Sequence, residues 1–355
     1  MRTCLMTGGA GFIGCAISAE LVERFDRVVA FDNLHPQIHR MPVRPSGLHR
    51  AVDLIRGDVT SADHWRALLR AVRPDVVIHL AAETGTGQSL TEASRHADVN
   101  LLGTTRMMDA LASSGHLPDR IVLASSRAVY GEGEWRDPAG TLHYPGQRTR
   151  AQLERAEWDF GGSHPVPAEA ARTHPHPTSV YGSTKLGQEN VLRAWAQSFG
   201  VALGIVRLQN VYGPGQSLIN SYTGIVTLFA QWARDGRSIP VYEDGLITRD
   251  FVFITDVVEA LVRLALPHTP VAAVPFDIGS GAGTTVLGLA RHLAQRYGAP
   301  EPHVTGQFRN GDVRHAACSI GRSEAELGWS PRVPLASGLD RLAAWIEGER
   351  VRRVA

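Results

Sequence analysis

The 355-residue sequence has few of the features that mark disulfide-rich or zinc-binding proteins. It contains three cysteines, Cys4, Cys15 and Cys318, which lie far apart and form no CxxC pair. An odd number of widely spaced cysteines suits neither a disulfide framework nor a cysteine-ligated metal. We therefore expect three buried or half-buried thiols in a reducing compartment.

Long hydrophobic runs and an excess of charge of one sign are also missing. No apolar run reaches the roughly 18 residues of a membrane-spanning helix, and glycines break the apolar stretch after Cys4, unlike a signal peptide. The 36 Lys and Arg residues balance 35 Asp and Glu residues, which gives no long-range attraction to nucleic acid or to a membrane surface. We expect a cytoplasmic protein that binds neither. The HPHP segment at 174–177 has no further ligand at suitable spacing, so we also expect no metal site.

What the first half does contain is an alternation of strand-like and helical segments. Short apolar and β-branched runs predict strands at 3–7, 27–32, 54–58, 75–81 and 120–125. Helical spacing predicts helices at 12–24, 61–72 and 92–114. This alternation is typical of an α/β fold with a doubly wound parallel sheet of the Rossmann type.

The second half begins with a less regular stretch. Residues 132–177, rich in Pro, Gly and His, predict a long insert with one helix at 150–159. Further predicted elements are a helix at 181–199, a strand at 202–208, a helix ending at 235, a strand at 249–254, a helix from 256 and a last helix at 334–350. We expect residues 1–212 to form the Rossmann domain, with segment 250–266 returning to it, and residues 213–350 to form mainly a smaller α/β substrate lobe.

A glycine-rich segment, TGGAGFIG, directly follows the first predicted strand. Its glycines would let the main chain turn tightly and approach a pyrophosphate at the N-terminus of a helix. Asp32 ends the second strand, where a carboxylate can accept the ribose hydroxyls of adenosine and would repel the 2′-phosphate of NADP. Since Asn33 and Leu34 add no positive charge, we predict NAD. The predicted cofactor contacts are Gly8, Gly11, Phe12, Ile13, Gly14, Asp32, Asn33, Asp58, Val59, Ala81 and Ala82, although Asp58 could instead cap helix 61–72.

The segment YGSTK supplies a candidate catalytic pair. Tyr181 and Lys185 are four residues apart, so on a helix they share one face. A lysine ammonium and an oxidised nicotinamide near the phenol would lower the pKa of Tyr181 toward working pH. Tyr181 would then serve as a general base.

Together with the glycine turn, Asp32 and the segment SSRAVYGEG at 125–133, this pattern resembles the extended short-chain dehydrogenase/reductase family of nucleotide-sugar enzymes. The resemblance covers nearly the whole chain. It implies that Ser126 hydrogen-bonds the sugar oxygen that Tyr181 deprotonates, and that Tyr181 and Lys185 also contact the cofactor. Ser125 would be structural. Asn100 in DVN is similar to the family's asparagine that steadies the active-site helix, and it would also contact the cofactor. Alternatively, Asn100 is an ordinary polar residue within a helix.

The resemblance also implies a set of residues around the sugar diphosphate. Arg249 and Arg309 would grip the diphosphate, because a guanidinium donates paired hydrogen bonds to oxyanions. Either arginine could instead form a surface salt bridge. The substrate contacts implied are Thr84, Ser126, Arg127, Asn210, Arg249, Arg309 and Asp312.

The residues between Ser126 and Tyr130 bear on the reaction. Dehydratases of this family carry an Asp-Glu pair there, because removal of water needs an acid and a base, and decarboxylating relatives keep the glutamate. This sequence has Arg127 and Ala128. The resemblance therefore implies an NAD-dependent 4-epimerase of a nucleotide-diphosphate sugar, which oxidises C4 transiently and returns the hydride to the opposite face. Strings such as LAAETGTGQS and EDGLITRDFVFITDVV are most similar to the branch of dTDP-L-rhamnose 4-epimerases and related enzymes.

Two other functions stay open at this point. One is an NAD(P)-dependent 4-ketoreductase or dehydrogenase with the same residues and an exchangeable cofactor. The other is a non-catalytic dinucleotide-binding scaffold, which the presence of both Tyr181 and Lys185 disfavours. The resemblance further implies a homodimer through helices 92–114 and 181–199. The apolar residues offered for that contact, unless they face the sheet, are Leu101, Leu102, Met107, Met108 and Leu111.

Overall fold

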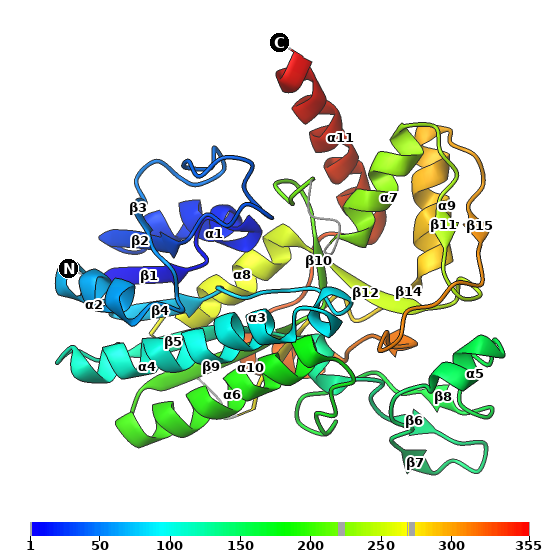
Figure 1. Cartoon of the computed structure of the whole chain (residues 1–355), viewed down its shortest axis with the longest axis horizontal. Coiled ribbons are helices and arrows are strands. Elements are labelled where there is room, and N and C mark those ends of the chain that lie inside the picture. Colours follow the sequence, from blue (N-terminus) through cyan, green and yellow to red (C-terminus); the bar gives the residue numbers. More distant parts are fainter. Residues whose placement is uncertain (1, 219–223, 268, 270–273, 355) are drawn as a thin grey trace.

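The centre of the fold is a seven-stranded parallel sheet (Figure 1). The computed structural model describes residues 2–218, 224–267, 269 and 274–354. The strand order is β13-β9-β5-β4-β1-β2-β3, and Leu5 of β1 lies opposite Val29 of β2 and Val77 of β4. The strands are β1 (Thr3–Thr7), β2 (Arg27–Asp32), β3 (Asp53–Arg56), β4 (Val76–His79), β5 (Arg120–Ser126), β9 (Ala202–Leu208) and β13 (Phe276–Ile278). The predicted Rossmann-type α/β fold is thus confirmed.

Helices cover both faces of this sheet (Figure 1). Cys4 and Met6 of β1 pack in one core with α1 (Phe12–Val22) and α8 (Ile254–Ala265). Leu5 packs in the other core with α2 (Ala62–Ala71), α4 (Gly103–Ser113) and α6 (Val180–Phe199). Successive strand residues point to opposite faces, and both faces are buried, which explains why the strands read as continuous apolar runs.

The helix predicted at 92–114 consists of three parts. α3 (Ala93–Ala97) leads through a π-helical turn, η2 (Asp98–Leu102), into α4. Wide turns of this kind are rare inside helices and occur often at functional sites. Met107 and Leu111 are fully buried against the sheet, so the expectation that they offer an outer surface is wrong, whereas Leu102 is 40% exposed.

The insert at 132–177 is more regular than its composition indicates. It folds into a small antiparallel sheet in the order β7-β6-β8, set apart from the large sheet (Figure 1). Its elements are β6 (Trp135–Arg136), β7 (Leu142–His143), α5 (Arg150–Glu154) and β8 (His164–Pro165). α5 ends before the predicted residue 159, since Ala156 adopts a left-handed φ of 56°.

The remaining chain builds a second lobe around a four-stranded sheet. Its strands are β10 (Asn210–Tyr212), β12 (Thr248–Phe253), β14 (Gly283–Thr285) and β16 (His315–Ala316), and a separate pair joins β11 (Pro240–Val241) to β15 (His303–Val304). Its helices are α7 (Ile225–Arg234), α9 (Val286–Tyr297) and α11 (Leu335–Val354), whereas α10 (Gly321–Leu327) packs on β13 and α8 at the large sheet. Within segment 250–266, α8 packs on the large sheet, whereas β12 belongs to the second lobe. Further along the chain, β13 forms an edge strand of the large sheet.

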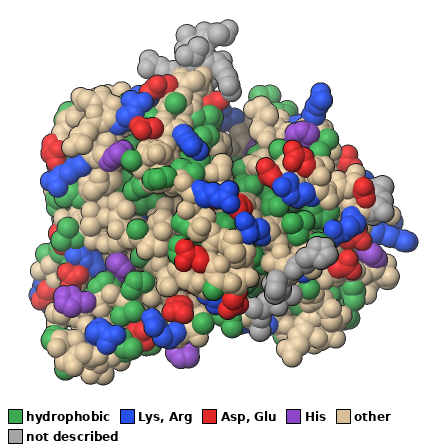
Figure 2. Space-filling view, turned by 180° about the vertical axis from the view of Figure 1, so that it is seen from behind, with side chains coloured by type: hydrophobic (Ala, Val, Ile, Leu, Met, Phe, Trp, Pro, Cys, Tyr) green, Lys and Arg blue, Asp and Glu red, His purple; other side chains and the backbone are tan. Residues whose placement is uncertain are grey.

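The surface mixes charges of both signs. On the face shown in Figure 2, Lys and Arg side chains alternate with Asp and Glu side chains. Among the described residues, none of the helices is long and apolar enough to cross a membrane. In the same part of the chain, no group of three or more His, Cys, Asp or Glu side chains is placed to hold a metal ion.

Candidate active site

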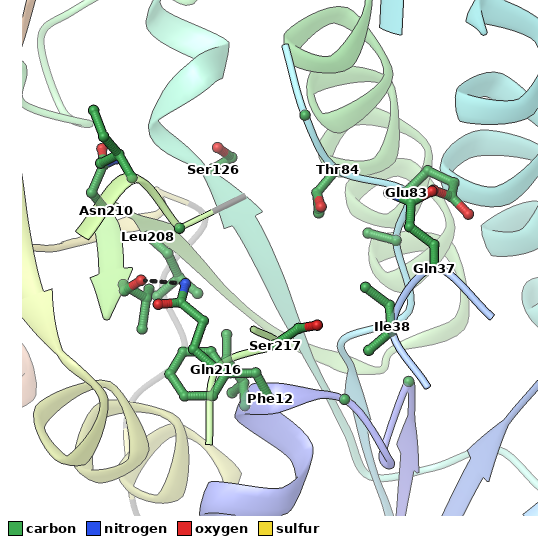
Figure 3. A pocket seen from close by; sticks show the side chains of 18 of the residues that line it. Phe12, Gln37, Ile38, Glu83, Thr84, Ser126, Leu208, Asn210, Gln216 and Ser217 are labelled. Carbon is green, nitrogen blue, oxygen red and sulfur yellow. Dashed lines mark hydrogen bonds between the residues drawn. The ribbon is translucent and has the colours of Figure 1, made fainter. Parts of the chain in front are cut away.

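A cavity of about 1090 Å³ lies between the carboxyl ends of the central strands and the second lobe. Doubly wound folds bind their ligands at this edge of the sheet. Figure 3 shows Asn210 and Leu208 along one side, and Thr84, Glu83, Gln37 and Ile38 along the other. The predicted site residues that line the cavity are Gly8, Gly11, Phe12, Ile13, Gly14, Asp32, Asn33, Val59, Ala81, Ala82, Thr84, Ser126, Arg127, Tyr181, Lys185, Asn210, Arg249, Arg309 and Asp312. Asp58 and Asn100 do not.

The turn between β1 and α1 leaves no space for side chains. Gly8 has a φ of 64°, and a Cβ atom there would lie 2.7 Å from the main-chain nitrogen of Ala81. A Cβ on Gly14 would lie 2.5 Å from the carbonyl oxygen of Gly9. α1 begins after Gly11 without a side-chain cap and without an acidic residue in its first turn, so its first N–H groups are available to an anion. This cradle fits the pyrophosphate of NAD.

Asp32 anchors the rim of the same region. Its carboxylate accepts hydrogen bonds from the main-chain N–H of Ala10 (3.0 Å) and of Leu34 (2.8 Å), and it lines the cavity. We call Gly8 to Gly14, Asp32, Ala81 and Ala82 the cofactor wall. Asp58 lies behind this wall, where Thr60 and Asn33 donate to its carboxylate. Burial would raise the pKa of Asp58, but these hydrogen bonds lower it. A direct contact of Asp58 with adenine remains a prediction.

Asn100 connects the π-helical turn to the active-site helix. Its amide donates to Thr184 Oγ1 (2.9 Å) and to the carbonyl of Glu83 (3.0 Å), and its Oδ1 accepts from the N–H of Glu83 (2.8 Å). Asn100 is fully buried. Its contacts match the steadying role implied by the family, and its predicted contact with the cofactor stays a prediction.

Tyr181 and Ser126 meet where the end of β5 faces the start of α6. Ser179 caps α6 by accepting from the N–H of Gly182 (3.0 Å), and Ser89 Oγ accepts the N–H of Tyr181 (3.1 Å). Burial raises the pKa of the Tyr181 phenol, while the hydrogen bond with Ser126 and the charge of Arg127 oppose this rise. The predicted lowering of this pKa involves bound oxidised NAD as well as Lys185, so it stays a prediction.

Lys185 lies one turn further along α6 and is 2% exposed. Its ammonium donates to the side chain of Gln188. Burial lowers the pKa of Lys185 to about 7, although the negative charge of Glu189 opposes this lowering. Ser125 has a structural contact, as predicted, since its hydroxyl donates to buried Glu189 (2.5 Å). Arg207 pairs with the same carboxylate (2.7 Å), which ties α6 to strands β5 and β9.

The opposite side of the cavity carries polar and charged residues from four separate segments. Arg127 donates to Asn210 Oδ1 (3.2 Å), and Arg249 pairs with Asp312 (2.5 Å). The guanidinium of Arg309 lies 4.9 Å from the ring centre of Tyr242. We call Arg127, Asn210, Arg249, Arg309 and Asp312 the diphosphate wall.

The charges of this wall perturb one another. Burial would raise the pKa of Asp312, but Arg249, Arg127 and Arg309 lower it. Burial and the neighbouring Arg249 lower the pKa of Arg127 to about 10. Three guanidiniums around one carboxylate leave net positive charge, which suits a dianionic ligand.

A buried ion cluster behind the diphosphate wall was not predicted from the sequence. Arg148 of the insert pairs with Glu132 (3.3 Å) and Glu243 (2.7 Å), and it donates to the carbonyl of Asp312 (2.9 Å). Arg314 also pairs with Glu243 (3.2 Å). Burial raises the pKa of Glu132 to about 7, against the Arg148 charge. No local pattern marks these residues, because each partner comes from a distant segment.

Aromatic side chains of the second lobe also line the cavity and were not predicted. They are Phe229 and Trp232 of α7, whose rings stack at 5.9 Å, Tyr242, and Trp345 of α11. The helical spacing of Phe229 and Trp232 is equally typical of an ordinary core helix, so it carries no distinct signal.

Three comparisons with known proteins agree with this geometry. Residues 4–151 and 159–278 match the model of the NAD dependent epimerase/dehydratase family. The chain is 59% identical over 352 residues to a dTDP-L-rhamnose 4-epimerase of Burkholderia thailandensis, covering 99% of this chain and 97% of the relative. The structure of the UDP-glucose 4-epimerase of Thermotoga maritima with UDP-glucose matches with a TM-score of 0.81 at 26% identity, over 98% of this chain and 100% of that one. The UDP-glucose 4-epimerase of Thermus thermophilus in complex with NAD gives a TM-score of 0.79 at 26% identity, over 98% and 99%.

Proposed function

The chain belongs to the NAD dependent epimerase/dehydratase family, and from this premise we propose that it is an NAD-dependent 4-epimerase of nucleotide-diphosphate sugars. We further propose dTDP-L-rhamnose or its C4 epimer as the sugar substrate, following the relative that is 59% identical. The sugar would lie between Ser126, Thr84 and Tyr181, and its diphosphate against the diphosphate wall.

The observation that carries this function is the position of Arg127. The family's dehydratases need a carboxylic acid pair beside the departing hydroxyl, and here the guanidinium of Arg127 stands there, donating to Asn210. The next carboxylate along the chain, Glu132, is engaged by Arg148 and by the main-chain N–H of Arg314 (2.8 Å). Arg127 and Ala128 therefore replace the acid pair that the family's dehydratases carry between Ser126 and Tyr130. Tyr181 and Ser126 suit oxidation and reduction of a carbinol.

The residues of the chain divide the work of such a reaction. NAD, when bound, supplies the acceptor and donor of the C4 hydride. Tyr181 takes the proton of the C4 hydroxyl and returns it after the 4-keto sugar has turned over, while Ser126 donates a hydrogen bond to the same oxygen. Lys185 is buried beside Tyr181. When Lys185 is protonated, its positive charge stabilises the Tyr181 phenolate. The diphosphate wall holds the nucleotide half in place while the sugar ring rotates.

The same proposal includes the division of the chain and its assembly. Residues 1–212 would bind mainly NAD, and residues 213–350 mainly the nucleotide sugar. We propose a homodimer in which α4 and α6, which lie side by side, pair with their copies (Figure 1). Leu102, which directly precedes α4, and Phe199 at the end of α6 are 40% and 46% exposed. Light scattering at micromolar concentration tests this, and a monomeric mass contradicts it. The free thiols of Cys4, Cys15 and Cys318 suit a cytoplasmic protein.

The decisive experiment follows the C4 hydrogen. Incubation with dTDP-L-rhamnose deuterated at C4 should yield the C4 epimer with deuterium still at C4, without loss of water and without consumption of added NAD. Tyr181→Phe serves as the matched control, because it should keep the fold and the bound NAD while lowering kcat by about 10² to 10⁴. Stoichiometric release of NADH would instead show a dehydrogenase, and loss of deuterium to added cofactor would show a ketoreductase with an exchangeable cofactor.

A further inference from the structure

Two glutamine side chains form a reciprocal hydrogen-bonded pair at the edge of the cavity. Gln37 Nε2 donates to Gln88 Oε1 (3.0 Å), and Gln88 Nε2 donates to Gln37 Oε1 (3.1 Å). The two residues are 51 positions apart, and Gln88 is only 3% exposed. Such a pair satisfies one donor and one acceptor on each amide at the same time.

Arg95 reinforces this pair from the same side as Gln88. Its guanidinium donates to Gln37 Oε1 (3.0 Å) and pairs with Glu92 (2.7 Å) and Glu83 (2.8 Å). Gln88 Nε2 also donates to Glu92 Oε1 (3.0 Å). Four side chains on the segment after β4 therefore position one amide from the segment after β2. We call Gln37, Gln88 and Arg95 the glutamine clasp.

The local main chain presents Gln37 for this contact. Leu34 adopts a left-handed φ of 56°, and the carbonyl of His35 accepts from the N–H of Ile38 (3.0 Å) and of His39 (2.9 Å). This turn places Gln37 at its tip, five residues after Asp32. On the other side, Gln88 begins the short 3₁₀ turn η1 (Gln88–Leu90).

The clasp joins two segments that both border the cofactor wall. Asn33, His35, Gln37 and Ile38 line the cavity after β2, and residues 81–87 with Arg95 line it after β4. Figure 3 shows Gln37 and Ile38 close to Glu83 on one side of the cavity. A dinucleotide whose ribose meets Asp32 and whose pyrophosphate meets Gly8 to Gly14 would lie between these two segments.

We propose that the glutamine clasp retains NAD by holding these two segments together over the bound cofactor. The need for retention follows from the proposed function, because an epimerase must return the same hydride to the sugar that gave it. The contacts of the clasp are entirely between side chains, so the clasp can open without breaking any strand or helix. Its removal should speed cofactor release while the cradle of the cofactor wall remains.

The test measures release of radiolabelled NAD from the loaded full-length protein, chased with excess unlabelled NAD and no sugar. Gln37→Ala should release NAD about tenfold faster, a change equivalent to ~1.4 kcal/mol and within reach of the lost hydrogen bonds. Gln88→Ala should speed release by no more than Gln37→Ala, because the hydrogen bond from Arg95 to Gln37 remains. The double variant should be no faster than Gln37→Ala, since both substitutions remove the Gln37–Gln88 contact. If Gln88→Ala does not fold, Gln37→Ala decides alone.

Met41→Ala is the matched control, because Met41 belongs to the same segment, is 64% exposed and does not line the cavity. Its release rate should equal that of the wild type. A Gln37→Ala rate within twofold of the wild type overturns the proposal. A variant that loses turnover but keeps NAD as long as the wild type also overturns the proposal. Ser89 beside Gln88 accepts a hydrogen bond from the N–H of Tyr181, so the clasp would then only position the tyrosine. If the wild type shows no epimerase activity while Gln37→Ala still releases NAD faster, the role of the clasp stands and the proposed function is refuted.

Discussion

The cofactor wall and the diphosphate wall face one cavity but are built by opposite means. The cofactor wall consists of main chain packed on main chain, with Gly8 so close to Ala81 that no Cβ atom fits. The diphosphate wall consists of charged and amide side chains from the 3₁₀ turn η3 (Arg127–Tyr130), from β10 and β12, and from the segment around Asp312. Arg148 of the insert at 132–177 supports this wall. A wall of main chain is damaged by adding atoms, whereas a wall of paired charges is damaged by removing one.

The difference also separates two kinds of energetic cost. Tight main-chain packing buries no charge and depends on glycine conformations. Buried ion pairs offset their desolvation through their partners, so each charge in the diphosphate wall depends on several others. Perturbing one wall at a time therefore shows whether the two are independent.

The largest effect is expected from Arg249→Met in the diphosphate wall. Arg249 is 5% exposed and pairs with Asp312, so its loss would remove the proposed diphosphate contact and leave a half-buried carboxylate with fewer partners. We expect kcat/KM to fall by about 10² to 10³, mainly through KM, corresponding to roughly 3–4 kcal/mol. Steady-state kinetics and bound-NAD content measure the two walls separately. Loss of bound NAD with an unchanged KM would show instead that Arg249 supports the cofactor wall. Arg249→Lys should recover only part of the lost kcat/KM, because lysine lacks the paired donors of a guanidinium.

An intermediate effect is expected from pH through Glu132, which supports the diphosphate wall. Burial raises the pKa of Glu132 from 4.5 to about 7, so between these values the folded protein keeps a proton that the unfolded chain releases. Stability should therefore fall as pH rises from about 4.5 to 7, by on the order of 3 kcal/mol. Urea unfolding at several pH values should show this fall in the wild type relative to Glu132→Gln, since all other titrating groups are common to both. Parallel curves would contradict the assignment.

The smallest effect is expected from Gly8→Ala in the cofactor wall. A φ of 64° costs an alanine about 1–2 kcal/mol, and the added Cβ would press on Ala81 at 2.7 Å. Gly11→Ala is the control, because Gly11 has an ordinary φ of −72° and its Cβ would come no closer than 3.1 Å to another atom. Thermal unfolding without NAD should show a lower Tm for Gly8→Ala than for Gly11→Ala. Equal values would mean that side-chain atoms fit this wall after all.

The cofactor wall could be predicted almost entirely from the sequence. The glycine turn, α1 and Asp32 lie within about 30 residues, where local spacing is informative, whereas Ala81 and Ala82 follow a separate predicted strand. The strands at 3–7 and 27–32 were predicted with their observed bounds. Tyr181 and Ser126 were brought together as the resemblance implied. Burial raises the pKa of Tyr181 in the protein without cofactor, and local spacing does not show this because burial is a property of the whole fold.

Other features depend on contacts that sequence spacing does not show. The partners of Arg148 lie 16 and 95 residues away, and those of Gln37 lie 51 and 58 residues away. The π-helical turn at Asp98–Leu102 widens the helix and shifts the angular position of later residues.

The position of α11 has a practical consequence for handling the protein. Trp345 and Glu349 of this helix line the cavity, and its last turns project away from the body of the molecule (Figure 1). A purification tag, fluorescent reporter or surface linker attached after α11 would thus be joined rigidly to a helix that borders the cavity. β1 starts at Thr3, at the amino end of the central sheet, opposite the edge that carries the cavity. Attachment before Thr3 would keep the label away from the ligand entrance and is the better choice for immobilised or labelled enzyme.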